Sequence, residues 1–143
     1  MGESGINIFD VAKYILHSIG GEISTMKLQK LCYYCQAWHL ALEGEPLFPQ
    51  EFEAWANGPV CRELFNAHKG WFGIREEDIP QTSCSRVELP EQATMHVDRV
   101  LEDYGCFDGA QLSELTHGES PWKDARRNQI IPLASIKKYY ESL

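Results

Sequence analysis

The sequence predicts a mainly α fold (α+β): a compact helical domain around a central helix at about 24–43, with a small two- or three-stranded β element. Between Ser24 and Gly44 apolar residues recur every three or four positions without an internal Pro or Gly, as on one face of a helix. The same spacing returns in shorter segments, whereas the alternation typical of strands is confined to a few residues near Trp55. The length of 143 residues suits one domain, so we expect residues 1–143 to fold as a unit.

The ends of the central helix are predicted as well as its period. Ser24 can accept hydrogen bonds from the first free backbone amides, and Gly44 permits the left-handed residue that ends many helices. Lys27, Lys30 and Gln36 fall outside the apolar stripe, so we expect them on the side that faces water. The stripe itself comprises Leu28, Leu31, Cys35, Trp38 and Leu42.

Further helices are expected on both sides of the central one. A first helix spans residues 7–18, with Asn7 as its cap and two glycines after it. Pro59 is well suited to be the first residue of a third helix that runs to about His68. A fourth helix begins at Pro90 and ends before Gly105.

The C-terminal third predicts three short helices. Asp108 and Gln111 have the spacing of a capping box, and Ser120 followed by a proline indicates a second start, with a helix through Arg127. A terminal helix contains Ile136 and two tyrosines after it.

The β element is expected at residues 52–55, with residues 130–131 as a possible strand partner. One more short strand is expected at residues 85–89. Residues 69–85 combine glycines, a proline and a charged run, which is typical of a surface loop.

Charge and composition exclude some partners. The formal net charge is −8, and basic residues cluster only in pairs, so we expect no direct nucleic-acid partner. No stretch approaches the ~20 apolar residues of a membrane span, so no membrane is expected either. Five cysteines are an odd number and two lie inside the central helix, which favours reduced thiols and a cytoplasmic location.

Four collinear segments carry a family resemblance: MKLQKLCYYCQAWHLALEGEPLF, EFEAWANGPV, LSELTHGESPWKDAR and a terminal IKKYY. Together they resemble the Panacea domain, also called the SocA-like antitoxin or phage-associated GepA family, from about Phe9 to Tyr140. The resemblance implies a mostly helical antitoxin that binds and neutralises a cognate toxin, often encoded by an adjacent gene. It also implies an alternative, a protease adaptor that delivers a bound toxin for degradation. Cys32 and Cys35 depart from the residues usual in this family.

The pair Cys32 and Cys35 matches a CxxC pattern, which is found in metal and redox sites. Zinc needs about four ligands, however, and the remaining cysteines, Cys61, Cys84 and Cys106, are single and scattered. A redox pair normally lies at a helix start, where the dipole lowers the thiol pKa, and these two lie further in. We therefore expect buried core thiols, no metal and no cofactor.

Catalysis has little support in the sequence. A nucleophilic cysteine with His39, His68 or His117 as its base remains an alternative, although no signature of such an enzyme accompanies them. The phosphate-binding patterns GxxxxGK[ST] and GxGxxG are missing from the sequence. We expect no enzyme and assign no catalytic residue.

Candidate partner-binding residues lie in three aromatic or turn segments. At residues 55–59, the free amides of a helix starting at Pro59 could hold an acidic group, or the segment could be a structural turn only. Glycines flank residues 71–72, which are the best candidates for exposed aromatic surface. His117 is either a polar contact or part of a helix end. The candidates are Trp55, Asn57, Gly58, Pro59, Trp71, Phe72 and His117.

Overall fold

The computed structural model describes residues 5–80 and 88–143, and it confirms a mainly α fold with a small β element. Within these ranges the chain forms seven α-helices, one 3-10 helix and four short strands. The α-helices are α1 (Ile8–Ile19), α2 (Thr25–Glu43), α3 (Arg62–His68), α4 (Glu91–Tyr104), α5 (Gly109–His117), α6 (Ser120–Lys123) and α7 (Leu133–Glu141). The other elements are β1 (Ile23–Ser24), β2 (Glu53–Trp55), β3 (Gly58–Val60), β4 (Gly73–Ile74) and η1 (Glu76–Asp78).

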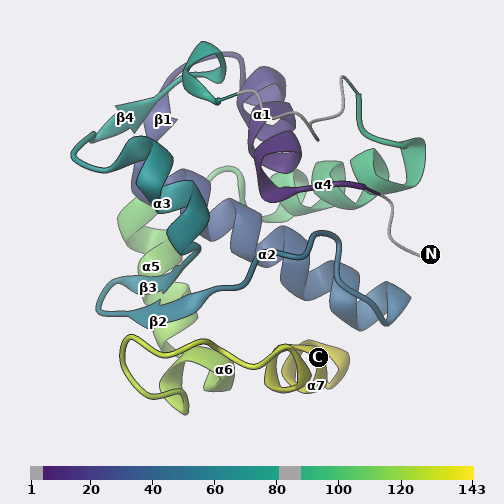
Figure 1. Cartoon of the computed structure of the whole chain (residues 1–143). Coiled ribbons are helices and arrows are strands. Elements are labelled where there is room, and N and C mark those ends of the chain that lie inside the picture. The colour runs from purple at the N-terminus through teal and green to yellow at the C-terminus, as the bar shows by residue number, and fades with distance from the viewer. Residues whose placement is uncertain (1–4, 81–87) are drawn as a thin grey trace.

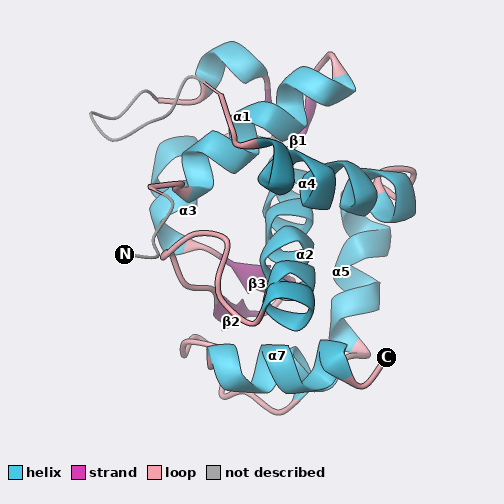
Figure 2. Ribbon diagram, turned by 90° about the vertical axis from the view of Figure 1, so that its right-hand side faces the viewer, coloured by secondary structure: helices cyan, strands magenta, loops and turns pink. Residues whose placement is uncertain are grey.

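Helix α2 is the centre of the structure, as predicted. It runs between α4 on one side and α7 on the other (Figures 1 and 2), and it also contacts α1, α5, β1 and β3. The Ser24 hydroxyl accepts from the Lys27 amide (3.0 Å), and Gly44 closes the helix in the left-handed region at φ 86°. Both predicted caps are therefore confirmed.

The predicted faces of α2 are partly wrong. Lys30 and Gln36 were expected towards water, yet both are buried, whereas Leu42 of the predicted stripe is 65% exposed. The reason is that neighbours cover α2 from several directions, so every residue from Leu28 to Ala37 is buried. Gln36 is satisfied there, because its amide donates to the Phe48 carbonyl (2.8 Å) and accepts from the Leu47 amide (2.7 Å).

The flanking helices begin largely where the sequence predicts. The Asn7 side chain caps α1, and Pro90 immediately precedes α4. Asp108 and Gln111 form the predicted capping box of α5. Helix α6 ends at Lys123, before the predicted end at Arg127, while α7 follows Pro132 as expected.

The β2–β3 hairpin replaces the predicted start of a helix at Pro59. Pro59 lies in β3 opposite Ala54, and the helix begins only at Arg62. A proline is tolerated there because β3 is an edge strand, which can dispense with a backbone donor. On the other side of β2, Ile130 forms the predicted pairing with Glu53.

One strand of a second small sheet, β4, lies inside the predicted surface loop. Strand β4 pairs antiparallel with β1, next to the start of α2. Of the strand predicted at residues 85–89, positions 85–87 lie outside the described residues, and Glu88 and Leu89 are not in a strand.

Candidate partner-binding site

The β2–β3 turn is held in place by two helices. The Ser113 hydroxyl of α5 donates to the Asn57 carbonyl (2.7 Å), and the Trp122 ring nitrogen of α6 donates to the Trp55 carbonyl (2.8 Å). Gly58 adopts φ 112°, a region that side chains disfavour. The turn is therefore a fixed wall and not a loose loop.

A pocket of about 210 Å³ opens beside this turn. Its walls come from the start of α2, the hairpin and α3. They comprise Thr25, Met26, Gln29, Lys30, Trp55, Ala56, Asn57, Val60, Phe65 and His68. The Trp55 and Phe65 rings meet edge to face at 4.9 Å, so one side of the pocket is aromatic.

Lys30 is the unusual member of this pocket. It is only 1% exposed, and burial lowers the pKa of its amine to about 7. A Cβ on Gly58 would lie 2.7 Å from Lys30 Cε and 2.8 Å from Thr116 Oγ1, so the glycine leaves room for the lysine stem. Helical spacing places Lys30 off the apolar stripe, so no sequence pattern indicated it as a site residue.

Gln29 and His68 form a polar pair beside Lys30. The Gln29 amide nitrogen lies 3.2 Å from the Cys61 carbonyl oxygen and 3.0 Å from His68 Nε2. The Gln29 amide oxygen accepts from the Cys61 backbone amide (2.9 Å). Burial, followed by the nearby Lys30 charge, lowers the pKa of His68, so its ring is neutral near pH 7.

The two exposed aromatic residues lie next to the pocket. Trp71 is 47% and Phe72 84% exposed. Their loop is tied to the start of α2, because the Thr25 amide donates to the Phe72 carbonyl (2.8 Å) and the Thr25 hydroxyl to the Trp71 carbonyl (3.3 Å). Since Thr25 also lines the pocket, the loop and the pocket belong to one face.

His117 lies on the α5–α6 side of the hairpin and does not line the pocket. Its ring stacks on Trp122 at 4.1 Å between centroids, and the Arg127 guanidinium lies 3.8 Å from the centroid of the same indole. Its Nε2 atom is buried and has no hydrogen-bond partner among the described residues. The same Trp122 holds the Trp55 carbonyl, so His117 supports the turn from behind.

The structure thus divides the seven predicted residues. Trp55 and Asn57 line the pocket, and Trp71 and Phe72 are exposed beside it. Gly58 and Pro59 are buried and shape the turn; the expected cradle of helix amides at Pro59 does not form, because no helix starts there.

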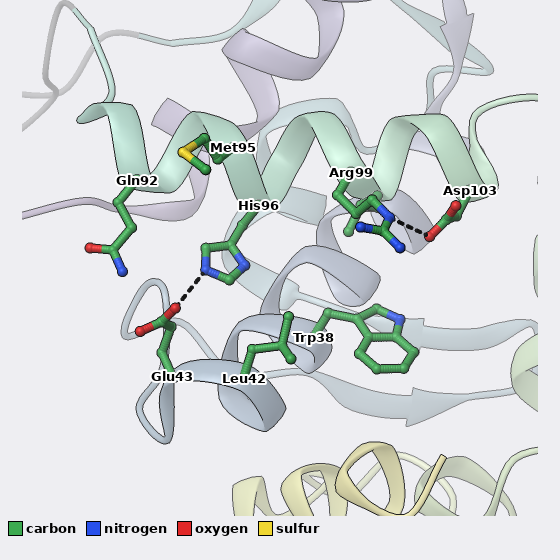
Figure 3. Close-up of a pocket in the computed structure, with 9 residues that line it drawn as sticks. Trp38, Leu42, Glu43, Gln92, Met95, His96, Arg99 and Asp103 are labelled. Atoms are coloured by element: carbon green, nitrogen blue, oxygen red, sulfur yellow. Dashed lines mark hydrogen bonds and ion pairs between the residues drawn. The ribbon is translucent and has the colours of Figure 1, made fainter.

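A second hollow, of about 520 Å³, lies between the C-terminal half of α2 and α4 (Figure 3). Leu42 and Met95 are 65% and 63% exposed there. His96 of α4 contacts the Glu43 carboxylate at 3.0 Å across the groove. This open groove mixes apolar side chains with the ionisable ones of Glu43, His96, Arg99 and Asp103, and none of these four is buried as Lys30 is.

Cys32, Cys35 and Cys61 behave as core residues, whereas Cys106 is exposed. Cys32 and Cys35 are buried, and burial raises the pKa of both thiols, which disfavours the nucleophilic thiolate. Of the proposed bases, His39 contacts the Glu45 carbonyl (2.7 Å) and His68 contacts Gln29. The ring of His117 stacks on Trp122. Among the residues that the structure describes, no group of three or more His, Cys, Asp or Glu could hold a metal ion.

Glu119 is a partly buried charged group on the other side of α2. Its carboxylate accepts from the Tyr34 hydroxyl of α2 (3.0 Å) and from the Tyr140 hydroxyl of α7. Burial raises the pKa of Glu119, and these two hydrogen bonds oppose the rise. Glu119 thereby joins α2 to α7.

Together the fold and site define a helical scaffold that presents a small pocket with a buried amine and two exposed aromatic rings. Over residues 5–80 and 88–143, none of the helices has the length and apolar character to cross a lipid bilayer. These features are typical of a binding surface.

Comparison with known proteins gives the family. Residues 28–123 match the Antitoxin SocA-like, Panacea domain, so this chain belongs to that family, as the sequence motifs predict. Antitoxin SocA of Caulobacter vibrioides (strain NA1000 / CB15N) is 32% identical over 109 residues, which cover 70% of this chain and 58% of that protein. No solved structure matches. The pocket residues from Lys30 to His68 all lie inside the family match.

Proposed function

We propose that this chain is an antitoxin that neutralises a cognate toxin protein by binding it directly in the cytoplasm. Membership of the SocA-like family is the observation that carries the proposal. The face formed by the pocket and by Trp71 and Phe72 supports it, because exposed aromatic side chains beside a pocket are typical of interface hot spots. An interface of standard size takes about 800 Å² from each partner, which suits this face and its surroundings.

The toxin is proposed to be encoded by an adjacent gene, and the chain's charge of −8 argues against nucleic acid as a direct partner. Co-expression of this chain with each adjacent gene product tests the proposal. We expect one product to arrest growth alone, and we expect this chain to restore growth and to co-purify with that product. An adjacent product whose toxicity persists, and which forms no complex, would contradict the proposal.

Paired surface variants locate the interface. Phe72→Asp places a charge on the proposed face, and Met95→Asp places the same charge in the α2–α4 groove. Both positions are exposed, so both variants should fold. We expect Phe72→Asp to weaken the complex and Met95→Asp to leave it intact; the reverse result would move the interface to the groove.

The half-life of the toxin distinguishes blockade from delivery to a protease. Under blockade, the toxin persists in the complex and is as stable with this chain as without it. A shortened half-life, measured after synthesis is stopped, would replace blockade with the adaptor mechanism.

A further inference from the structure

Lys30 is a buried amine with no hydrogen-bond or ion-pair partner among the residues that the structure describes. Lysine is almost never fully buried unless it is paired, because removal of the ammonium from water is costly. Among the described residues no hydrogen bond or ion pair reaches the Lys30 amine, and this 1% exposed side chain lines the pocket. The Lys30 amine is thus removed from water beside a pocket that a ligand can enter.

The neighbouring polar groups bond to one another or to other elements, and among the described residues none of them bonds to the Lys30 amine. The Gln29 amide oxygen is taken by the Cys61 amide, and the Gln29 amide nitrogen by the Cys61 carbonyl and His68 Nε2. The Asn57 carbonyl at the turn accepts from Ser113. The remaining walls around Lys30 are mostly apolar, notably Trp55 and Phe65.

The structure also keeps space for this side chain. Gly58 has a left-handed backbone and lies directly over the Lys30 stem, where any Cβ would overlap with Cε. A smaller apolar residue in place of Lys30 would remove both the close contact and the buried amine. A buried lysine beneath a glycine that leaves room for its stem indicates that the amine serves a ligand and not the core.

We propose that this pocket receives a carboxylate side chain, Asp or Glu, of the bound protein partner, which pairs with Lys30 Nζ. This inference rests on the proposed function. A carboxylate fits better than a phosphate, because a single amine among apolar walls matches one negative charge and a short aliphatic stem, whereas phosphate sites have several donors. A pocket of about 210 Å³ admits one side chain and excludes a folded segment.

The protonation state of the amine fits this role. Burial lowers the Lys30 pKa to about 7, so a large share of the amines is neutral near pH 7 in the free chain. An entering carboxylate favours the charged form, and the resulting ion pair is shielded from water by the aromatic walls.

The first test uses the chain alone with sodium butyrate as the probe and butyramide as its neutral match. The NMR signal of ¹³C-labelled Lys30 Cε reports on the amine, and the backbone amides of Trp55 and Ala56 report on the pocket. We expect saturable shifts with butyrate, none with butyramide, and none in Lys30→Met at the Trp55 and Ala56 amides. Equal shifts with both probes, or no saturable shift with butyrate, would overturn the carboxylate assignment.

The second test uses the complex with the toxin found by co-expression. Lys30→Met removes the amine, Ala56→Trp fills the pocket mouth, and Lys138→Met removes an exposed lysine on α7 as the matched control. We expect the first two to raise the dissociation constant on the order of thirtyfold or more, as for a truncated buried charge pair, with the control within about twofold. Zero-length carbodiimide coupling should join Lys30 to an acidic residue of the toxin, identified by mass spectrometry.

The outcomes separate this inference from the proposed function. A toxin that binds wild type and Lys30→Met equally well would overturn the inference and leave the antitoxin proposal standing. Butyrate binding without any effect of Lys30→Met on the toxin would assign the pocket to a free carboxylate and overturn the partner's side chain as its occupant. Failure of every adjacent product to bind would count against the antitoxin proposal, while the butyrate titration would still decide the chemistry of the pocket.

Discussion

Lys30 of α2 is a buried charged side chain, and Glu119, which precedes α6 and bonds to α2, is a partly buried one, but their surroundings differ. Glu119 accepts hydrogen bonds from Tyr34 and Tyr140, which come from two helices. Lys30 has no such partner among the described residues, and it faces a pocket. A buried polar group with its hydrogen bonds complete stabilises a fold, whereas one left incomplete costs stability and is available to a ligand. The comparison separates a structural from a binding charged side chain on two sides of α2.

The largest expected change in stability comes from substitution of Glu119. Glu119→Ala leaves two tyrosine hydroxyls without their acceptor, so we expect the free energy of unfolding to fall by about 2 to 4 kcal/mol. Urea denaturation followed by circular dichroism measures it. Glu114→Ala, at an exposed position on α5, is the control. A loss no larger than that of the control would mean that Glu119 does not join α2 to α7.

Removal of the Lys30 amine is expected to raise the free energy of unfolding, whereas removal of the Glu119 carboxylate lowers it. Lys30→Met keeps the side-chain length and removes the desolvated amine, so we expect the free energy of unfolding at pH 7 to rise by about 1 to 4 kcal/mol. The same urea titration measures it. A destabilised Lys30→Met would show that the amine has a structural partner and would remove the contrast with Glu119.

Substitution of Gly58 is expected to lower stability by a smaller amount, which depends on the side chain at position 30. Gly58→Ala combines a left-handed backbone with a Cβ 2.7 Å from Lys30 Cε, and we expect it to cost about 1 to 3 kcal/mol. In a Lys30→Ala background the overlap with the stem is relieved, so the cost of the same substitution should be smaller. A double-mutant cycle measures this coupling. Strictly additive costs would show that the strain comes from the backbone alone.

The smallest expected effect is the change with pH in the stability difference between Lys30→Met and wild type. The Lys30 pKa is lowered from 10.5 to about 7 in the folded chain, so between these values the unfolded state binds more protons and folding becomes more favourable as pH rises. The stability gap between Lys30→Met and wild type should therefore narrow from pH 7 to pH 9, by about 1 kcal/mol per pH unit. His68, which faces Lys30 from α3, has a lowered pKa and stays neutral in this window. A constant gap would contradict the burial of a titrating amine.

The sequence predicts what depends on local chemistry. The caps at Ser24 and Gly44, and the capping box at Asp108, are set by residues within one turn of each other, so they could be read without the fold. The pairing of residues 130–131 with β2 was also predicted, because only a few short segments alternate in the way that strands require.

The rest depends on contacts that are distant in the sequence. Helical periodicity assumes one buried face, whereas α2 is covered by helices and strands from before and after it, so Lys30 and Gln36 were placed wrongly. Pro59 suits the first turn of a helix equally well as an edge strand, and the pairing with Ala54 decides between them. The pocket joins α2, the hairpin and α3, a juxtaposition that no single motif contains.

The hydrogen bonds that hold the β2–β3 turn limit how the proposed binding face can evolve towards a new partner. Because α5 and α6 hold the carbonyls of Asn57 and Trp55, the pocket wall loses its conformational entropy during folding and not at the moment of association. Trp71 and Phe72, by contrast, are tied to α2 through their backbone carbonyls, and their side chains are half and largely exposed. Divergence towards a new partner would therefore proceed through the two aromatic side chains, while the rigid pocket would retain the same acidic anchor.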